Sequence, residues 1–265
     1  MTVSIWQQAH RRREVAYDVV VVGGGIVGCS TAYWLSREHP SLQVALLEAD
    51  ALGAGASGRN AGFILQGTHT DYCSDVRRYG TRTAQRLWAF TRANRDLLVS
   101  ELRGTAFGWH SDGSVTAAGS DEENERLQAS VSALRSAGAP VIHLDASETN
   151  DRLQASGFRG GLLVTIGATV DPLRLVRHIA ARSDADVYSQ HPVRRVRWRE
   201  QAAHLVTPTR SFRADRVVLA VGASLPTLLP TTSAYVRPVR AQMLAPAATE
   251  APPGPVPGYS HHGGF

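Results

Sequence analysis

The sequence predicts an α/β fold that begins with a strand–turn–helix–strand unit. An apolar run at residues 19–22 leads into a glycine-rich turn, residues 23–28, whose glycines have GxGxxG spacing. An amphipathic helical segment follows the turn. A second apolar run, residues 44–47, then places Glu48 about twenty residues beyond the turn. This combination is typical of a βαβ unit that binds a dinucleotide, so we expect a Rossmann-like domain.

Each residue type in this unit has a physical role. Gly23 allows a sharp turn after the strand, Gly25 lets a pyrophosphate approach the backbone, and Gly28 permits close packing of helix and strand. The phosphates are expected at the first turn of the helix, where unpaired N–H groups and the helix dipole attract anions. Glu48 is placed to accept hydrogen bonds from ribose hydroxyls, and its charge would repel a 2′-phosphate, which argues against NADP.

A second loop of small residues follows Glu48. Residues 53–62 read GAGASGRNAG, which is rich in backbone donors and too polar for a core. With the first motif, this loop resembles the FAD-dependent D-amino-acid oxidase superfamily, in the branch of glycine oxidase, sarcosine oxidase and gamma-glutamylputrescine oxidase. The resemblance implies that the loop wraps the flavin diphosphate. It covers nearly all of the chain from Asp18 onward, although members of the family continue further, so we expect this chain to be a fragment.

The resemblance also assigns later segments. It implies that the residue at Val193 contacts adenine through its backbone, and that the segment VVLAVGA, residues 217–223, closes the nucleotide domain at Gly222. Val221 stands where family members usually carry Thr. The expected cofactor-binding residues are Gly23, Gly25, Ile26, Val27, Gly28, Glu48, Ala49, Ser57, Gly58, Arg59, Asn60, Gly62, Val193 and Gly222. The loop lacks a His, Cys or Tyr for covalent attachment, which favours noncovalent FAD.

One residue of this set has open alternatives. Arg59 is expected to neutralise the diphosphate, to lie near the flavin, or to form a salt bridge with a nearby acid. The alternative for the whole loop is a surface loop without a ligand.

The remaining periodicities predict further elements. Helical spacing at residues 81–102 predicts a long helix whose Arg82, Arg86, Arg92 and Arg95 face solvent. Residues 121–137 predict a second helix, capped by Ser120 or Asp121, and Pro172 starts a third, with Asp171 as its cap. The expected strands are residues 109–118, 141–144, 162–166, 187–189, 193–198, 204–207, 216–221 and 235–244.

We therefore expect two interleaved domains. Residues 15–103 and 160–228 are assigned to a discontinuous, Rossmann-like FAD-binding domain. Residues 104–159 and 229–265 are assigned to a partial, smaller substrate domain that contains a sheet.

The resemblance implies an FAD-dependent oxidoreductase that oxidises the C–N bond of an amine or amino acid, by hydride transfer to flavin N5 with oxygen as acceptor. No Ser/His/Asp triad or zinc-ligand spacing competes for the active site. His261 and His262 are weak catalytic candidates, and at most one of them can face a site because neighbouring strand residues point to opposite faces. The alternative functions are a nicotinamide-dependent dehydrogenase and a truncated, non-catalytic nucleotide-binding fragment.

Composition limits the partners. The chain of 265 residues is 43% hydrophobic, and no stretch has the length and apolarity of a membrane span. The net charge is +5, with arginine as the basic residue throughout, but no dense basic stripe indicates nucleic-acid binding. We expect a small amine or amino acid as substrate, and neither nucleic acid nor membrane as partner. Cys29 and Cys73 lack CxxC or metal-ligand spacing, so two free thiols in a reducing cytoplasm are expected.

Overall fold

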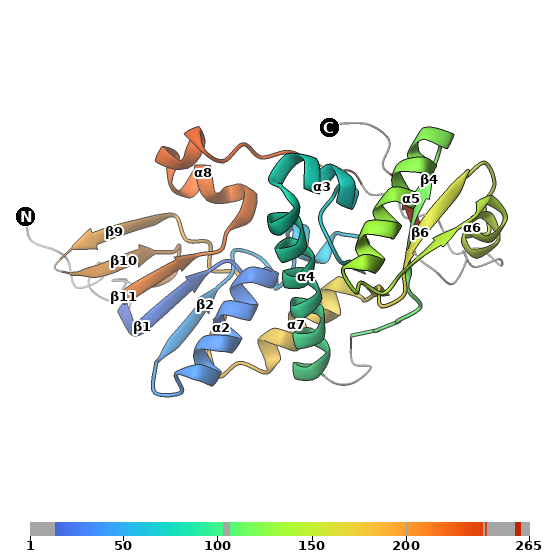
Figure 1. Cartoon of the computed structure of the whole chain (residues 1–265). Helices are drawn as coiled ribbons and strands as arrows, with labels where there is room; N and C mark the ends of the chain where they lie inside the picture. Colours follow the sequence, from blue (N-terminus) through green and yellow to red (C-terminus); the bar gives the residue numbers. More distant parts are fainter. Residues whose placement is uncertain (1–13, 103–106, 200, 241, 243–257, 261–265) are drawn as a thin grey trace, which may run out of the picture. The chain divides into compact units, whose positions relative to one another are not determined.

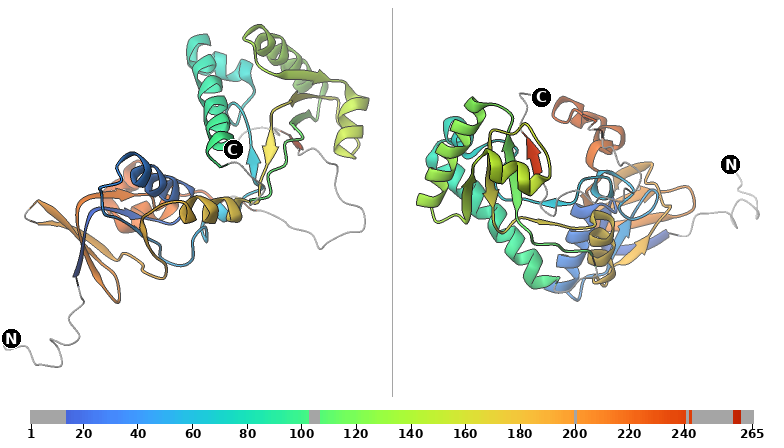
Figure 2. Two further views of the ribbon diagram at one scale, coloured as in Figure 1. Left: turned by 90° about the horizontal axis from the view of Figure 1, so that it is seen from below. Right: turned by 90° about the vertical axis from the view of Figure 1, so that its right-hand side faces the viewer.

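The computed structural model describes residues 14–102, 107–199, 201–240, 242 and 258–260. The chain forms two compact units (Figures 1 and 2). Unit 1 contains residues 1–60 and 172–243, and unit 2 contains residues 61–171 and 244–265. The chain therefore leaves unit 1 after Asn60 and returns to it at Pro172.

Unit 1 is built on a six-stranded sheet with the order β8-β2-β1-β11-β10-β9. The strands of its parallel part are β1 (Glu14–Val22), β2 (Val44–Leu47), β8 (Asp186–Tyr188) and β11 (Ser211–Leu219). Strands β10 (Ala202–Val206) and β9 (Arg195–Arg199) extend the sheet in antiparallel fashion. The mixed sheet confirms the predicted α/β class.

Buried residues of this sheet lie on both of its faces. Alternation along β1 sends Val20 and Val22 to one face, where they pack with Phe212 and other strand residues. Helix α2 (Ile26–Glu38) covers the opposite face and packs beside α7 (Pro172–Ala181) (Figure 1). The short elements of unit 1 are η1 (Ala56–Gly58), η2 (Gly222–Ser224), α8 (Leu225–Leu228) and η3 (Pro230–Ala234).

Unit 2 contains a four-stranded sheet with the order β12-β4-β6-β5. Its strands are β4 (Ser114–Ala118), β5 (Val141–Leu144), β6 (Gly160–Val164) and β12 (Gly258–Ser260), and a separate two-stranded ladder joins β3 (Phe63–Ile64) to β7 (Ala168–Thr169). The helices are α3 (Tyr72–Tyr79), α4 (Thr81–Glu101), α5 (Asp121–Ser136) and α6 (Ala146–Leu153). Leu127, Val131 and Leu134 of α5 pack on one face of the sheet, and Leu153 packs on the other.

Several predicted elements are confirmed within a few residues. The long helix is α4, the second helix is α5 with Ser120 as its cap, and the third begins at Pro172. Strands β1 and β11 each begin about five residues earlier than predicted. Their early residues alternate between apolar and polar, as in Phe212, Arg213 and Ala214, so the apolar run marks only the fully buried part of each strand.

Two helices were missed in polar segments. Helix α3 lies in a segment of mostly polar residues for which no element was predicted, and Asp71 caps it by accepting a hydrogen bond from Ser74 N (2.9 Å). Helix α6 starts at a capping box, in which Asp145 and Glu148 each accept from the other's backbone N–H. The D-x-x-E spacing of this box is readable in the sequence.

The predicted strand at residues 235–244 is wrong over its described part. Residues 235–240 form no strand, and the Tyr235 and Val239 side chains are 89% and 83% exposed. Pro238 lacks the N–H that a ladder needs, and no described strand pairs with this segment. Alternating side chains alone were not sufficient to predict a strand here.

Arg95 also departs from prediction. Arg82, Arg86 and Arg92 are exposed as expected, but the Arg95 side chain is 18% exposed and its guanidinium lies 5.7 Å from the centre of the Trp109 ring. Arg95 belongs to the helix face that packs within unit 2. Long arginine stems bury readily while the charged group keeps polar contacts, which a polarity pattern does not register.

The compact units divide the chain differently from the expected domains. Residues 61–103 and 160–171, expected in the nucleotide-binding domain, lie in unit 2, and residues 229–243 lie in unit 1. The cause is that α4, β6 and β7 pack with the smaller sheets of unit 2. The assignment of FAD-binding and substrate roles to these parts stays a prediction.

Candidate nucleotide-binding site

The turn between β1 and α2 depends on two glycines. Gly23 has φ +111°, and a Cβ on it would collide with the carbonyl of Ala220 at the end of β11. A Cβ on Gly28 would collide with the Gly23 carbonyl oxygen. The first turn of α2 therefore lies directly against the strand end, as predicted for close helix–strand packing.

The N-terminus of α2 has open donors. Gly25 provides no side-chain cap, and no acidic residue lies in the first turn. The Ile26 N–H donates to Ser57 Oγ (2.9 Å), whereas the Val27 and Gly28 N–H groups have no acceptor among the described residues. The positive end of the helix dipole thus faces a position that suits an anion.

The second glycine-rich segment is bonded to the first. Gly53 N donates to Gly24 O (2.9 Å), and Ser57 reaches Ile26 as described. Asn60 Nδ2 donates to the carbonyls of Ala56 and Ser57, which closes the loop around η1. The two segments predicted to form one site therefore lie together in unit 1, up to Asn60.

One expected role changes in detail. Gly25 was expected to leave room for a pyrophosphate, but a Cβ on Gly25 would lie 2.9 Å from Ser57 Oγ. The space beside Gly25 therefore holds the Ser57 hydroxyl. Gly24 and Gly53, which connect the two loops, were not predicted as site residues; the run of three glycines at residues 23–25 was the available signal for Gly24.

Glu48 points toward the turn from the end of β2. Its Oε2 accepts from Gly24 N (2.6 Å) and its Oε1 accepts from Asp50 N (2.9 Å). These bonds hold a half-buried carboxylate at the carboxyl edge of the sheet while each oxygen keeps a further lone pair. Ala49 follows it and is exposed.

The loop after β8 lies beside Glu48. His191 N donates to Glu48 O (2.8 Å), and Gln190 N donates to Asp50 O (2.9 Å). Val193, two residues later, packs its side chain against the core of unit 1, and its backbone N–H and C=O have no partner among the described residues. The adenine contact that the family resemblance implies for this backbone stays a prediction.

The end of β11 completes this edge. Ala220 N donates to Val22 O (2.8 Å), and Gly222 follows with φ +51°. A Cβ on Gly222 would meet nothing, so its left-handed backbone, not close packing, favours glycine there. Val221 packs partly against the core, which needs no hydroxyl at this position.

Other predicted residues do not join this arrangement. Arg59 is exposed, and no ion pair connects it to a carboxylate of the described chain. Gly58 lies against the Gly53 carbonyl and Leu173 inside unit 1, so it packs the loop. Gly62 lies in unit 2, where its carbonyl accepts from Val170 N (2.9 Å). His261 and His262 lie outside the described residues.

The cysteines are both free thiols. Cys29 is buried in α2, and its Sγ donates to Gly24 O (3.5 Å). Burial, together with the Glu48 carboxylate, raises the pKa of Cys29 to about 12. This thiol stays protonated at neutral pH and acts as a packing residue behind the turn.

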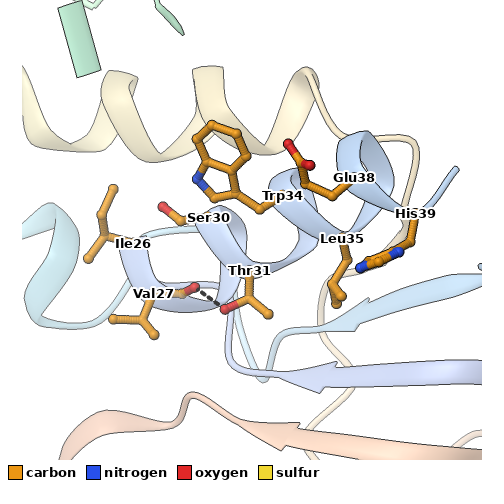
Figure 3. A pocket seen from close by; sticks show the side chains of 8 residues that line it. All are labelled: Ile26, Val27, Ser30, Thr31, Trp34, Leu35, Glu38 and His39. Carbon is orange, nitrogen blue, oxygen red and sulfur yellow. Dashed lines mark hydrogen bonds between the residues drawn. The ribbon is translucent and has the colours of Figure 1, made fainter. Parts of the chain in front are cut away.

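A depression of about 580 Å³ runs along the outer side of α2 (Figure 3). It starts at Ile26 and Val27 and ends at His39, and its lining is mostly apolar. The Thr31 hydroxyl inside it already donates to Val27 O (2.8 Å). The depression therefore adjoins the turn at Ile26 and Val27, but Glu48 and the second glycine-rich loop do not line it.

Across the described residues, no helix has the length and apolarity to cross a membrane. In the same part of the chain, no group of three or more His, Cys, Asp or Glu side chains is arranged to bind a metal ion.

Comparison with known proteins identifies close resemblances. The chain is 28% identical over 216 residues to glycine oxidase of Geobacillus kaustophilus, covering 78% of this chain and 55% of that protein. It is 27% identical over 163 residues to gamma-glutamylputrescine oxidoreductase of Escherichia coli, covering 61% and 38%. The chain thus spans about half the length of these relatives or less.

Comparison with solved structures also finds a glycine oxidase. The crystal structure of glycine oxidase from Geobacillus kaustophilus matches with a TM-score of 0.64 at 26% identity, covering 80% of this chain and 57% of that one. The family model described as FAD dependent oxidoreductase matches residues 18–264. The resemblance inferred from the glycine-rich loops is confirmed, and the chain belongs to the FAD dependent oxidoreductase family.

Proposed function

We propose that this chain binds FAD at the β1–α2 turn and serves the oxidation of the C–N bond of a small amine or amino acid. The observation that carries the proposal is the connection of two glycine-rich segments to each other and to Glu48 by direct hydrogen bonds. FAD is the cofactor of the family to which the chain belongs.

The diphosphate would bind at the start of α2. The free N–H groups of Val27 and Gly28 point outward from the helix N-terminus, where the dipole favours negative charge. Ser57 Oγ already accepts from Ile26 N, so its own proton is available to a phosphate oxygen. Arg59, exposed and without an ion pair to described carboxylates, supplies positive charge near this loop.

The adenosine half would lie toward β2 and β8. Glu48 keeps a free lone pair on each oxygen, which suits the two ribose hydroxyls and disfavours a 2′-phosphate. The unpaired main-chain groups of Val193 suit the adenine edge. With this set, the residues present fit an adenine dinucleotide.

When bound, FAD supplies the redox chemistry by accepting a hydride at N5 from the carbon next to the substrate nitrogen. The chain's part is to bind and orient the cofactor. Substrates of the amine or amino-acid class are supported by the names of the relatives, glycine oxidase and gamma-glutamylputrescine oxidoreductase. Oxygen as acceptor, noncovalent binding and a cytoplasmic location stay predictions.

We assign the FAD-binding role to unit 1 and propose unit 2 as the substrate-side part. A nicotinamide-dependent dehydrogenase would use the same turn and acid, but the family match and the second glycine-rich loop favour flavin. A nucleotide-binding chain without turnover is the remaining alternative.

Anaerobic mixing of the FAD-loaded chain with glycine, sarcosine, a D-amino acid and gamma-glutamylputrescine tests the proposal. We expect loss of flavin absorbance with at least one of them, and hydrogen peroxide once air is admitted. Retention of FAD without reduction by any amine would support the non-catalytic alternative. Reduction of NAD⁺ by one of these amines, without flavin, would support the dehydrogenase.

A further inference from the structure

Unit 2 contains two buried polar atoms of complementary character without a partner. Gln66 Oε1 is an acceptor and Trp88 Nε1 is a donor, and neither has a hydrogen-bond partner among the described residues. Gln66 is 6% exposed. A buried donor or acceptor without a partner costs stability, so such groups in folded proteins usually bind protein atoms or ordered water.

Both residues line the same small cavity. It has a volume of about 20 Å³ and lies among α3, α4, β4 and β6. A cavity needs roughly 10–15 Å³ to hold a water molecule, whereas small-molecule ligands need several hundred. The volume therefore admits one water and no substrate.

The lining supplies the partners that a water needs. Three threonines, Thr68, Thr70 and Thr116, line the cavity beside Gln66 and Trp88. Thr68 and Thr70 donate their protons to the buried Asp75 (2.8 Å each), and Thr68 Oγ1 also accepts from Thr70 N (3.2 Å). Each hydroxyl oxygen has two lone pairs, so both keep capacity to accept from a water. Buried waters typically make about three hydrogen bonds, and the cavity offers at least that number.

The backbone beside the cavity is already held close to α4. Gly67 N donates to Thr91 Oγ1 (2.9 Å), and a Cβ on Gly67, which has φ +89°, would lie 2.6 Å from the Trp88 ring. Because the chain passes so close to the indole, Gln66 cannot be displaced far from Trp88.

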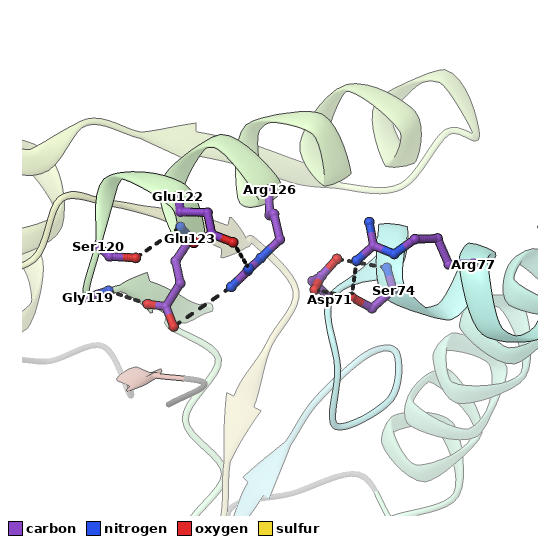
Figure 4. A network of polar contacts seen from close by, with 8 residues as sticks. All are labelled: Asp71, Ser74, Arg77, Gly119, Ser120, Glu122, Glu123 and Arg126. Atoms are coloured by element: carbon purple, nitrogen blue, oxygen red, sulfur yellow. Dashed lines mark hydrogen bonds and ion pairs between the residues drawn. The ribbon is translucent and has the colours of Figure 1, made fainter. Parts of the chain in front are cut away.

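We propose that a structural water molecule occupies this cavity, accepting from Trp88 Nε1 and donating to Gln66 Oε1. The water connects the segment after β3 to helix α4 and gives both buried polar atoms a hydrogen-bond partner. Asp71 also lines the cavity and accepts a hydrogen bond from the Ser130 hydroxyl of α5 (3.3 Å). Figure 4 shows its contacts with Ser74 at the start of α3. The water is a positioning element and makes no contact with cofactor or substrate in this proposal.

A crystal structure of the unmodified chain at about 2 Å or better tests the proposal directly. We expect one density peak within hydrogen-bond distance of both atoms. An empty cavity, or a direct bond between Gln66 and Trp88, would overturn the proposal.

A double-mutant cycle gives an independent test. Trp88→Phe and Gln66→Met each remove one hydrogen-bond partner of the water, so each should lower the melting temperature by roughly 2–8 °C. The double variant removes both partners, so its loss should be smaller than the sum of the two. Trp34→Phe and Gln128→Met, the same changes at sites outside the cavity, should add without coupling. Additive losses for Trp88→Phe and Gln66→Met would contradict a shared water.

Discussion

The helix starts of the two units differ in how their backbone donors are satisfied. In unit 2, Asp71, Ser120 and Asp145 cap α3, α5 and α6 with their side chains, and acids occupy the first turns. Helix α4, which follows α3 after a single glycine, has no such cap. In unit 1, α2 has no side-chain cap and no acid in its first turn, and two glycine-rich segments meet there. Unit 2 satisfies most of its helix starts internally, whereas α2 keeps donors for an external anion.

The largest expected effect is a loss of FAD affinity, caused by adding a side chain at the β1–α2 turn. Gly28→Ala places a methyl group against the Gly23 backbone carbonyl, which cannot move without displacing β1. Such overpacking costs about 1–3 kcal/mol and distorts the phosphate position, so FAD affinity should fall about a hundredfold. Calorimetric titration with FAD measures it.

The matched change in unit 2 is Gly161→Ala, whose methyl would meet three groups at 3.1 Å. It should lower the melting temperature while leaving FAD affinity within about twofold. Equal losses of FAD affinity for the two variants would remove the distinction between the units.

The next effect in size concerns Glu48. Glu48→Gln replaces a charged acceptor by a neutral amide, so FAD affinity should fall about 10- to 100-fold, as for loss of charge-assisted hydrogen bonds. Glu38→Gln, on an exposed position of α2, should have no effect. An unchanged affinity for Glu48→Gln would show that the ribose binds elsewhere.

A smaller effect is expected from removing a cap in unit 2. Asp71→Ala should cost about 1 kcal/mol of stability, because α3 loses its N-cap. Although burial opposes ionisation, hydrogen bonds from Ser74 and Ser130 and the nearby Arg77 lower the pKa of Asp71 below 3.8. The stabilisation by Asp71 is then fully present above pH 3.8 and is lost as the pH falls below it.

Thermal melts from pH 7 to pH 3 measure this difference. The difference in melting temperature between Asp71→Ala and the unmodified chain should be constant down to about pH 4 and should shrink below it. A gap that widens in acid would have the wrong sign for a lowered pKa.

The smallest effect is a difference in thiol reactivity. Cys29 of unit 1 is fully buried with a pKa near 12, whereas Cys73 of unit 2 is half-buried. At pH 8 a thiol reagent should therefore modify Cys73 first and Cys29 only on unfolding. Mass spectrometry of the modified peptides measures the order. Rapid modification of Cys29 in the folded chain would contradict the packing described behind the turn.

Local spacing made unit 1 readable from sequence. The turn, Glu48 and the loop at Ser57 follow from short-range rules on glycine, helix dipoles and strand ends, and the structure places all three together. The contact between Gly25 and Ser57 was not readable, because it joins residues about thirty positions apart.

Unit 2 was harder to predict because tertiary packing decides its elements. Helix α3 has a polar composition and is held by its cap and by Tyr72, which is buried against Trp88. Arg95 reads as a surface residue but lies over Trp109. The cavity lined by Gln66 and Trp88 depends on the packing of helices α3, α4 and α5 against strands β4 and β6, which no sequence periodicity indicates.

Titration of the purified chain with FAD and with FMN, in the presence and absence of ADP, tests the central claim most directly. If the glycine-rich segments and Glu48 hold the adenosine diphosphate half, one FAD binds per chain, ADP competes with it, and FMN binds at least about tenfold more weakly. FMN binding as tightly as FAD, with no competition from ADP, would contradict the account.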